Sequence, residues 1–347
     1  MIQIYFCSLK NRTTKVNLNQ RIEILVQLGE YLSTEEMEWQ MAREKATREN
    51  GWFVPEFINL AITNIKEQFL SQGSLTRFAD QYPGIADQTK DKRLGIVMAG
   101  NIPLVGFHDF LCGFLSGYQL LLKPSSKDEV LIKHLVQVIK TWHPDLENLI
   151  LFADQLKGCD AYIATGSNNS GRYFEYYFRN YPSIIRKNRT SIAVLTGDET
   201  EQQLASLADD MMLYFGLGCR NVSKIYVPEG YDFQRLLAAL KPYKWMADHN
   251  KYRNNYDYNL ALHILNNKFY MTDGTLLLIE NESLFSPIAQ VHYEFYRENP
   301  VTRLRTNHSE EIQCISGEGG IPLGQVQAPA ISDFADGIDT MTFLTGL

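Results

Sequence analysis

The stretch "KRLGIVMAGNIPLVGFHDFL", residues 92–111, sets the architecture expected for this chain. It begins with an apolar run, turns at Gly-Asn-Ile-Pro (100–103) and continues with a helical pattern. A strand, a loop and a helix therefore follow one another. Strands that alternate with helices predict a mostly parallel sheet, with ligand-binding groups where the strands end.

The same alternation of apolar runs and helical patterns recurs further along the chain. Short apolar runs stand at "YQLLLKPSS" (118–126), "CDAYIATGS" (159–167), "TSIAVLTG" (190–197) and "SKIYVPEG" (223–230), and helical patterns separate them. We therefore expect an α/β fold with two interleaved α/β domains rather than a string of separate units.

The N-terminal part lacks such strands and is expected to be helical. In "STEEMEWQMAREKATRENG" (33–51), Ser33 and Glu36 have the spacing of a capping box, and Gly51 closes the segment. A second helix starts at Pro55, with apolar residues at helical spacing: Phe57, Ala61, Ile65 and Phe69.

These patterns divide the chain into four parts. We predict an N-terminal helical segment (1–88), a cofactor-binding α/β domain (89–195), a catalytic α/β domain (196–315) and a C-terminal segment (316–347) that returns to the domain interface. No internal repeat or low-complexity tract interrupts them.

Composition excludes several classes of protein. With 347 residues and a net charge of -7, the chain lacks the basic balance of a general nucleic-acid binder. No run approaches the roughly 20 apolar residues of a membrane span, and the start shows no signal peptide, so a cytoplasmic protein is expected. The five cysteines are widely spaced without a C-x-x-C pair, so neither a disulfide framework nor a metal site is predicted.

Four short motifs occur in one order: "GNIP" (100–103), "LLLKPSS" (120–126), "ATGSNNSG" (164–171) and "GLGC" (216–219). This order resembles the aldehyde dehydrogenase superfamily. Within that superfamily, the local sequence is similar to the acyl-CoA reductases related to the long-chain fatty acyl reductase of bacterial luminescence. The similarity is carried by "GNIPLVGFHDFL", "RKNRTSIAVL", "GLGCRNVSKIYVP" and "LGQVQAP". The resemblance covers about residues 90–347 and implies an aldehyde dehydrogenase-like fold. The usual G-x-G-x-x-G dinucleotide fingerprint is missing.

The resemblance implies that Cys219 is a nucleophile for a thioester, and that the Asn101 amide and the Cys219 backbone N–H form an oxyanion hole. An ordinary thiol is only a few per cent thiolate at neutral pH, so the site must favour the anion. Arg220, and amides exposed by Gly216 and Gly218, are candidates for this. The alternatives are that Cys219 fills a tight turn and that Asn101 serves its own turn.

Cofactor binding is expected at Lys123, Ser125 and Ser126, and at Gly166 and Ser167. The resemblance implies that Lys123 reaches the adenosine ribose. Members selective for NAD commonly carry a carboxylate where this chain has Ser126, so NADPH is favoured over NADH. Gly166 and Ser167 begin a helix whose amides suit a pyrophosphate, although a solvated helix start and an ordinary N-cap explain the same residues.

Two departures from the superfamily bear on the chemistry. Ile185 stands about where hydrolytic aldehyde dehydrogenases carry the glutamate that activates water, so the acyl-enzyme should await CoA or hydride. Ser283 replaces the glutamate that holds the nicotinamide ribose, which leaves open what takes its place. His108 stands at a helix start, where it either shuttles a proton or satisfies local hydrogen bonds.

The predicted function is NADPH-dependent reduction of an acyl-CoA, in particular a fatty acyl-CoA, to an aldehyde through a thioacyl-enzyme on Cys219. Two alternatives stay open: a cysteine acyltransferase or thioesterase without a nicotinamide cofactor, and a non-catalytic binding homologue. Acyl-CoA is the expected partner, with no nucleic acid and no membrane span. The oligomeric state, a homo-oligomer included, and the acyl chain length stay open.

Overall fold

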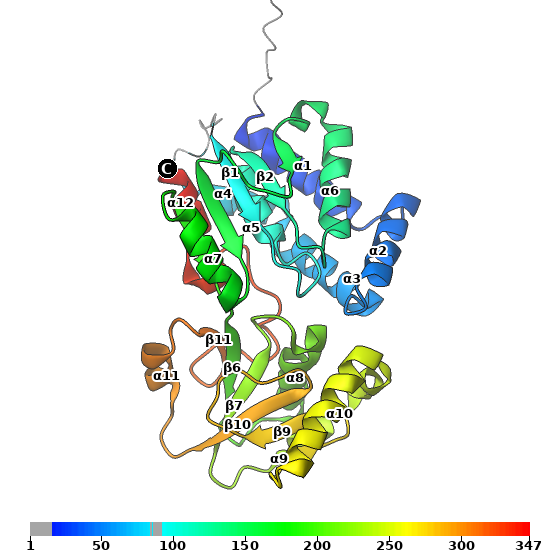
Figure 1. Cartoon of the computed structure of the whole chain (residues 1–347), viewed down its shortest axis with the longest axis vertical. Coiled ribbons are helices and arrows are strands. Elements are labelled where there is room, and N and C mark those ends of the chain that lie inside the picture. The colour runs from blue at the N-terminus through cyan, green and yellow to red at the C-terminus, as the bar shows by residue number, and fades with distance from the viewer. Residues whose placement is uncertain (1–15, 84, 86–91) are drawn as a thin grey trace, which may run out of the picture.

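Two mostly parallel sheets, one in each lobe, organise the computed structural model, which describes residues 16–83, 85 and 92–347 (Figure 1). The first has five parallel strands in the order β3-β2-β1-β4-β5. The second has six, in the order β11-β6-β7-β10-β9-β8, and only the β8–β9 pair is antiparallel among the described strands. The predicted α/β fold class is confirmed.

The first lobe holds β1 to β5 and the helices around them. Its strands are β1 (Arg93–Val97), β2 (Gln119–Lys123), β3 (Ile150–Phe152), β4 (Ala161–Thr165) and β5 (Ser183–Arg186). Its helices are α1 (Leu18–Tyr31), α2 (Met37–Glu49), α3 (Pro55–Asn64), α4 (Gln72–Ala79), α5 (Phe107–Leu115), α6 (Val130–Trp142), α7 (Asn168–Phe178) and the C-terminal α12 (Thr340–Thr345). A π-helical turn, Ile65–Phe69, extends α3, and a 3₁₀ turn covers Pro144–Leu146.

The second lobe holds the remaining strands and helices. Its strands are β6 (Thr190–Val194), β7 (Val222–Pro228), β8 (Met271–Thr272), β9 (Leu277–Glu280), β10 (Gln290–Tyr296) and β11 (Ile312–Gly317). Its helices are α8 (Glu201–Met212), α9 (Phe233–Ala239), α10 (Asn250–Leu265) and α11 (Val301–Asn307), with 3₁₀ turns at Leu213–Gly216, Lys241–Asp248 and Ala335–Gly337.

The sheets divide the chain earlier than the predicted boundary at 195/196. Strand β6 pairs with β7 and β11 in the second sheet, so the change of sheet falls between β5 and β6. Only residues 187–189 separate these two strands. A three-residue link is too short to show the Gly-, Pro- and polar-rich composition of a longer loop. A buried strand is equally apolar in either sheet, so the sequence does not show which sheet β6 joins.

The N-terminal helices pack into the first lobe, although residues 1–15, 84 and 86–88 of the predicted segment lie outside the described residues. The capping box at Ser33 and Glu36 is wrong. Helix α2 begins after Glu36 without a side-chain cap, and the Ser33 hydroxyl donates to the Gly29 carbonyl at 3.4 Å. Ser33 therefore completes the end of α1 instead of starting α2.

Helix α3 contacts the cores of both lobes. Phe57 and Ala61 belong to the apolar core of the second lobe, whereas Ile58 and Ile62 belong to that of the first. Residues four apart share a helix face, so the two pairs form adjacent stripes. The helix therefore joins the lobes through side-chain packing.

The C-terminal residues return from the second lobe to the first, where α12 lies beside the first sheet (Figure 1). Arg186 donates to the buried carboxylate of Asp109 at 2.6 Å and to the Thr340 hydroxyl at 2.9 Å. This ion pair therefore joins β5, α5 and the last helix. None of the described helices is long and apolar enough to cross a membrane.

We predict that Arg186→Ala strongly destabilises the protein, because it leaves the Asp109 carboxylate buried and unpaired. Such a loss typically costs about 3–5 kcal/mol in the free energy of unfolding, which urea denaturation would measure. The matched control is Lys187→Ala, whose partner Glu175 lies 2.6 Å away with both side chains about half exposed. That exposed pair should contribute about 0–1 kcal/mol. Equal losses for the two variants would contradict the prediction.

Candidate active site

The loop that carries Cys219 starts with an unusual run of backbone conformations. Tyr214, Phe215 and Gly216 have φ values of 54°, 58° and 72°. Glycine adopts the left-handed region readily, but each larger residue there costs about 1–2 kcal/mol. Surrounding contacts must supply that energy. The ring of Phe215 lies 5.0 Å from that of Phe57 on α3 and 4.5 Å from that of His249.

Asn221 closes this loop with both ends of its side-chain amide. Its Oδ1 accepts the Gly218 backbone N–H at 2.8 Å, and its Nδ2 donates to the carbonyls of Leu213 at 2.8 Å and Asp210 at 3.1 Å. Asn221 is itself 2% exposed. Cys219 therefore sits on a turn that a buried amide holds from both sides. Asn221 was not predicted from the sequence, although a polar Asn directly before an apolar strand was a signal.

Asn101 reaches the same loop from the other lobe. Its Nδ2 donates to the carbonyl of Leu217 at 2.7 Å. A side-chain amide carries two N–H groups, so one can still donate to an oxyanion on an acyl group at Cys219. The structure thus brings the two predicted catalytic residues to one place, from positions more than a hundred residues apart.

The Cys219 thiol is half-buried, and its pKa is raised. Burial is the main cause, and the negative charge of Asp336 adds to it, while Arg220 and the backbone N–H of Cys219 act in the opposite direction. The expectation that the surroundings favour the thiolate is therefore wrong in its net direction. Arg220 does favour the anion, as predicted, but desolvation outweighs it.

Further contacts hold the residues around the thiol. The Ser191 hydroxyl on β6 donates to the Cys219 carbonyl at 3.0 Å and lies 2.9 Å from the sulfur of Cys314. Arg220 donates to the Asp333 carbonyl at 3.1 Å, and its charge lowers the pKa of the Cys314 thiol, which burial raises. Strands β6 and β11 and the C-terminal segment thereby position the nucleophile and its neighbouring cation.

The predicted cofactor residues follow three neighbouring strands of the first sheet. Lys123 ends β2, the 100–103 turn follows β1, and Gly166 and Ser167 follow β4. The chain order reverses between β1 and β4, because β2 and β3 lie on one side of β1 and β4 and β5 on the other. Open α/β sheets bind ligands at such a switch point.

Lys123 and Ser126 are exposed at the end of β2. Ser125 packs closely on the neighbouring turn, because a Cβ added to Gly100 would lie 2.7 Å from its Cβ. The nearby carboxylate of Asp128 is buried and accepts the Leu104 backbone N–H at 2.7 Å. Asp128 therefore does not stand in for the ribose carboxylate that is missing at Ser126.

Gly166 and Ser167 have separate roles at the start of α7. Ser167 is the N-cap, and its hydroxyl accepts the Ser170 N–H at 3.2 Å. The Gly166 N–H donates to the Arg186 carbonyl at 3.1 Å, so it is not free for a phosphate. Close packing leaves no space for a side chain at Gly166, since a Cβ there would lie only 2.8 Å from the Cβ of Ser170. The first turn of α7 still offers backbone N–H groups.

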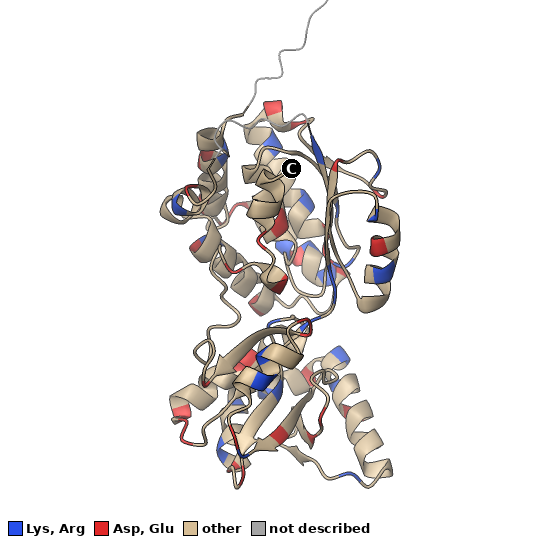
Figure 2. Ribbon diagram, turned by 90° about the vertical axis from the view of Figure 1, so that its left-hand side faces the viewer, with Lys and Arg blue, Asp and Glu red and all other residues tan. Residues whose placement is uncertain are grey.

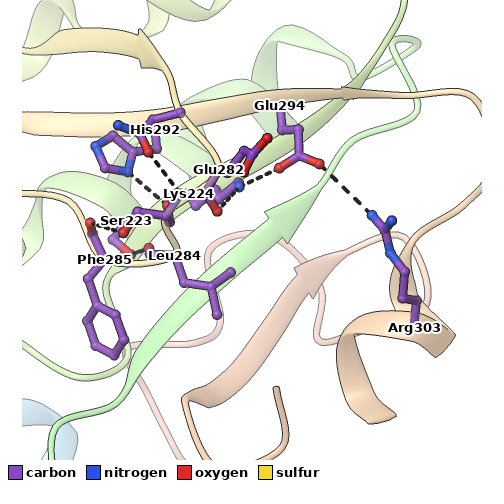
Figure 3. A network of polar contacts seen from close by, with 10 residues as sticks. Ser223, Lys224, Glu282, Leu284, Phe285, His292, Glu294 and Arg303 are labelled. Carbon is purple, nitrogen blue, oxygen red and sulfur yellow. Dashed lines mark hydrogen bonds and ion pairs between the residues drawn. The ribbon is translucent and has the colours of Figure 1, made fainter. Parts of the chain in front are cut away.

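Side chains of the second sheet hold the backbone of the loop that contains Ser283, between Glu282 and Leu284, which Figure 3 labels. Lys224 donates to the Glu282 carbonyl at 2.7 Å, and Ser223 donates to the Leu284 carbonyl at 2.6 Å. The Nδ1 atom of His292 lies 2.8 Å from the Ser283 carbonyl oxygen. The Ser283 hydroxyl donates to the carbonyl of Phe285, within its own loop. No replacement for the ribose glutamate is evident among these described contacts.

The other two singled-out residues lie in the first lobe. Ile185 is half-buried in β5, opposite Ala164 of β4. His108 Nε2 lies 2.7 Å from the Ile331 carbonyl, and its Nδ1 lies 3.9 Å from the sulfur of Cys112. Both ring nitrogens have protein partners, and burial lowers the pKa of His108. These contacts favour the local hydrogen-bonding role over the proton shuttle.

Comparison with known proteins places these features in a family context. The sequence model of the family described as "Acyl-CoA reductase (LuxC)" matches residues 62–240, a little over half of the chain. None of the curated proteins compared with the chain matches it.

Solved structures similar to this fold include several aldehyde dehydrogenases. The enzyme from Bacillus cereus in its NAD+ complex has a TM-score of 0.63 at 13% identity, over 88% of this chain and 72% of its own. The Mycobacterium tuberculosis enzyme with NAD+ has a TM-score of 0.59 at 15% identity, over 86% and 73%. A betaine aldehyde dehydrogenase variant from Staphylococcus aureus has a TM-score of 0.61 at 13% identity, over 86% of this chain and 71% of its own. At such identities the likeness shows the fold alone, and it confirms the predicted aldehyde dehydrogenase-like architecture.

We predict that Arg220→Ala slows alkylation of Cys219 by iodoacetamide at pH 7. Arg220 lowers the pKa of the thiol, so its loss raises that pKa further and reduces the thiolate fraction at neutral pH. Peptide mass spectrometry would follow the reaction at Cys219 across a pH series. The variant's pH profile should shift upward, and the two rates should converge at high pH.

Two controls separate charge from structure. Arg220→Lys keeps a cation and should stay close to the wild-type profile, and Arg253→Ala removes an exposed arginine of α10 that pairs with Asp257. A downward shift in Arg220→Ala, or an equal shift in Arg253→Ala, would refute the assigned role of Arg220.

Proposed function

The chain belongs to the acyl-CoA reductase (LuxC) family, and on that basis we propose that it reduces an acyl-CoA to an aldehyde with NADPH, through an acyl group carried on Cys219. Family and fold support an oxidoreductase that acts on acyl groups or aldehydes. The observation that carries the finer proposal is the contact between Asn101 and the Leu217 carbonyl, which joins an amide donor to the loop of the thiol.

In the first half of the reaction the Cys219 thiolate attacks the thioester carbonyl. A bond from sulfur to carbon forms, and the carbonyl oxygen takes the negative charge, to which the Asn101 amide and the Cys219 N–H donate. The carbon–sulfur bond to CoA then breaks, and CoA leaves as its thiolate. One oxyanion donor of this kind typically contributes about 3–4 kcal/mol to lowering the barrier.

The residues at the strand ends are suited to a nicotinamide dinucleotide. Exposed Lys123 and Ser126 offer a cation and a hydroxyl for the ribose and its 2′-phosphate, and the first turn of α7 offers amides to the pyrophosphate. Gly100 lets the turn after β1 pack directly against Ser125. When bound, the reduced cofactor supplies a hydride to the acyl carbon, and the same N–H donors hold the oxygen while Cys219 leaves as thiolate.

Reduction is favoured over hydrolysis because Ile185 stands where hydrolytic relatives carry a water-activating glutamate. The alternatives that stay open are a cysteine acyltransferase or thioesterase, and a non-catalytic homologue. Both lack reduction by NADPH. Charged residues of both signs are interspersed over both lobes in Figure 2, which gives no support for a nucleic-acid partner.

We predict that Cys219→Ser forms no thioacyl-enzyme while it binds NADPH within a few-fold of the wild type, because the cofactor residues belong to other strands. Intact-protein and peptide mass spectrometry after mixing with an acyl-CoA would measure the adduct. Cys314→Ser is the matched control, since Cys314 is the other half-buried thiol at this site, and it should still acylate Cys219. An acyl adduct found on Cys314 in the wild type would refute the proposal.

We also predict that Ser126→Glu shifts preference from NADPH toward NADH. A carboxylate there repels the 2′-phosphate of NADPH but can accept a hydrogen bond from a ribose hydroxyl of NADH. We expect the ratio of kcat/KM for the two cofactors to change by the equivalent of about 1–3 kcal/mol. Ser309→Glu, an exposed position on the second lobe, is the control for added charge. An unchanged ratio of kcat/KM for the two cofactors would show that the ribose does not lie beside Lys123.

A further inference from the structure

Asp128 is a buried carboxylate in the loop between β2 and α6. It is 6% exposed, and its Oδ2 accepts the backbone N–H of Leu104 at 2.7 Å. Asp128 therefore satisfies the Leu104 N–H of the loop that follows β1.

That loop is strained at the point where Asp128 binds it. Leu104 has a φ of 55° and is 4% exposed. The left-handed region is unfavourable for leucine, and a buried N–H without an acceptor would destabilise the loop further. The conformation of Leu104 is thus maintained by an acceptor from the loop that follows β2. Asn101 lies three residues earlier on the same turn.

The loop that follows β1 and the loop that follows β2 are also in direct contact. The backbone N–H of Asp128 donates to the Ser125 carbonyl at 2.9 Å, which folds the loop back on itself. A Cβ added to Gly100 would lie 2.7 Å from the Cβ of Ser125 and 3.2 Å from that of Asp128. The turn that carries Asn101 is therefore packed against the stretch that carries the proposed cofactor residues, with no space between them for a side chain.

We infer that Asp128 is a positioning residue for Asn101: by holding the Leu104 backbone it places the Asn101 amide against the Leu217 carbonyl and beside Cys219. The inference rests on the proposed function and deepens it, since it assigns to the loop after β2 a second task besides cofactor binding. Asp128 touches neither substrate nor cofactor in this role. It acts through Asn101.

The role requires an acceptor at this position and does not require a charge. The second carboxylate oxygen, Oδ1, has no hydrogen-bond partner among the described residues, and burial raises the pKa of Asp128 well above its usual range. Asparagine keeps an acceptor oxygen of nearly the same shape. Asp128→Asn should therefore retain the position of Asn101, whereas Asp128→Ala should lose it.

The test measures the single-turnover rate of acylation of Cys219 by acyl-CoA in the absence of NADPH. For Asp128→Ala we expect a fall of about 10²-fold, the lower end of what the loss of one oxyanion donor costs. Asp128→Asn should stay within a few-fold of the wild type. Glu129→Gln is the control, because the neighbouring Glu129 is half-exposed and, among the described residues, its side chain pairs with Lys133 at 2.7 Å.

A double-mutant cycle distinguishes positioning from general destabilisation. If Asp128 acts through Asn101, then Asp128→Ala has little further effect on acylation in an Asn101→Ala background. A purely structural role would reduce the rate by the same factor in both backgrounds. Equal factors, or a wild-type rate for Asp128→Ala, would overturn the inference.

A crystal structure of the Asp128→Ala variant gives an answer that does not depend on activity. We expect the hydrogen bond between Asn101 and the Leu217 carbonyl to be broken there and kept in Asp128→Asn. An intact bond in Asp128→Ala would overturn the inference. A wild-type protein that forms no thioacyl-enzyme would instead refute the proposed function, while the crystal structures would still decide whether Asp128 positions Asn101.

Discussion

The left-handed run from Tyr214 to Gly216 is the constraint on which the site depends. These conformations are unfavourable for Tyr214 and Phe215, and they persist because buried aromatic packing and the Asn221 amide oppose their relaxation. These conformations let the chain reverse between α8 and β7, which places Cys219 next to Asn101 of the other lobe. Helix α3 contributes Phe57 to this packing, so the N-terminal segment takes part in shaping the site.

The electrostatics of Cys219 are a balance between burial and nearby charge. Burial raises the pKa of the thiol, Asp336 adds to that effect, and Arg220 reduces it. A thiol that is mostly protonated is protected from unselective reaction, but it must lose its proton before it attacks a thioester. The proposal therefore makes Arg220 important for reactivity, while the donors at Asn101 and the Cys219 backbone act on the oxygen of the substrate.

Much of the architecture could be predicted from local patterns, and the corrections concern long-range contacts. The strands at 92–97 and 118–123 were evident from their apolar runs, and the order of four motifs indicated the aldehyde dehydrogenase-like fold that the comparisons confirm. Ser33 was assigned to the wrong helix end because one side chain can serve either of two adjacent helices. The sheet that β6 joins is decided by partners from distant parts of the chain, which no local pattern contains.

The same distinction applies within the site. Cys219 and Asn101 were recognisable from their motifs, whereas Asp128 and Asp336 were missed, because their roles depend on the Leu104 backbone and on the return of the C-terminal segment. The net direction of the Cys219 pKa also needed the structure. Sequence shows Arg220 next to the thiol, but it does not show how much water the fold removes.

The most direct test of the account is a single-turnover experiment with acyl-CoA in the absence of NADPH, followed by addition of the cofactor. Mass spectrometry should detect an acyl group on Cys219 that persists for minutes, because general-base assistance to water is typically worth about 10²–10⁴ in rate and Ile185 cannot provide it. NADPH should then release the aldehyde, and free CoA should regenerate acyl-CoA. Rapid release of the free carboxylic acid before NADPH is added would contradict the account, and would direct attention to Asp336 as the base.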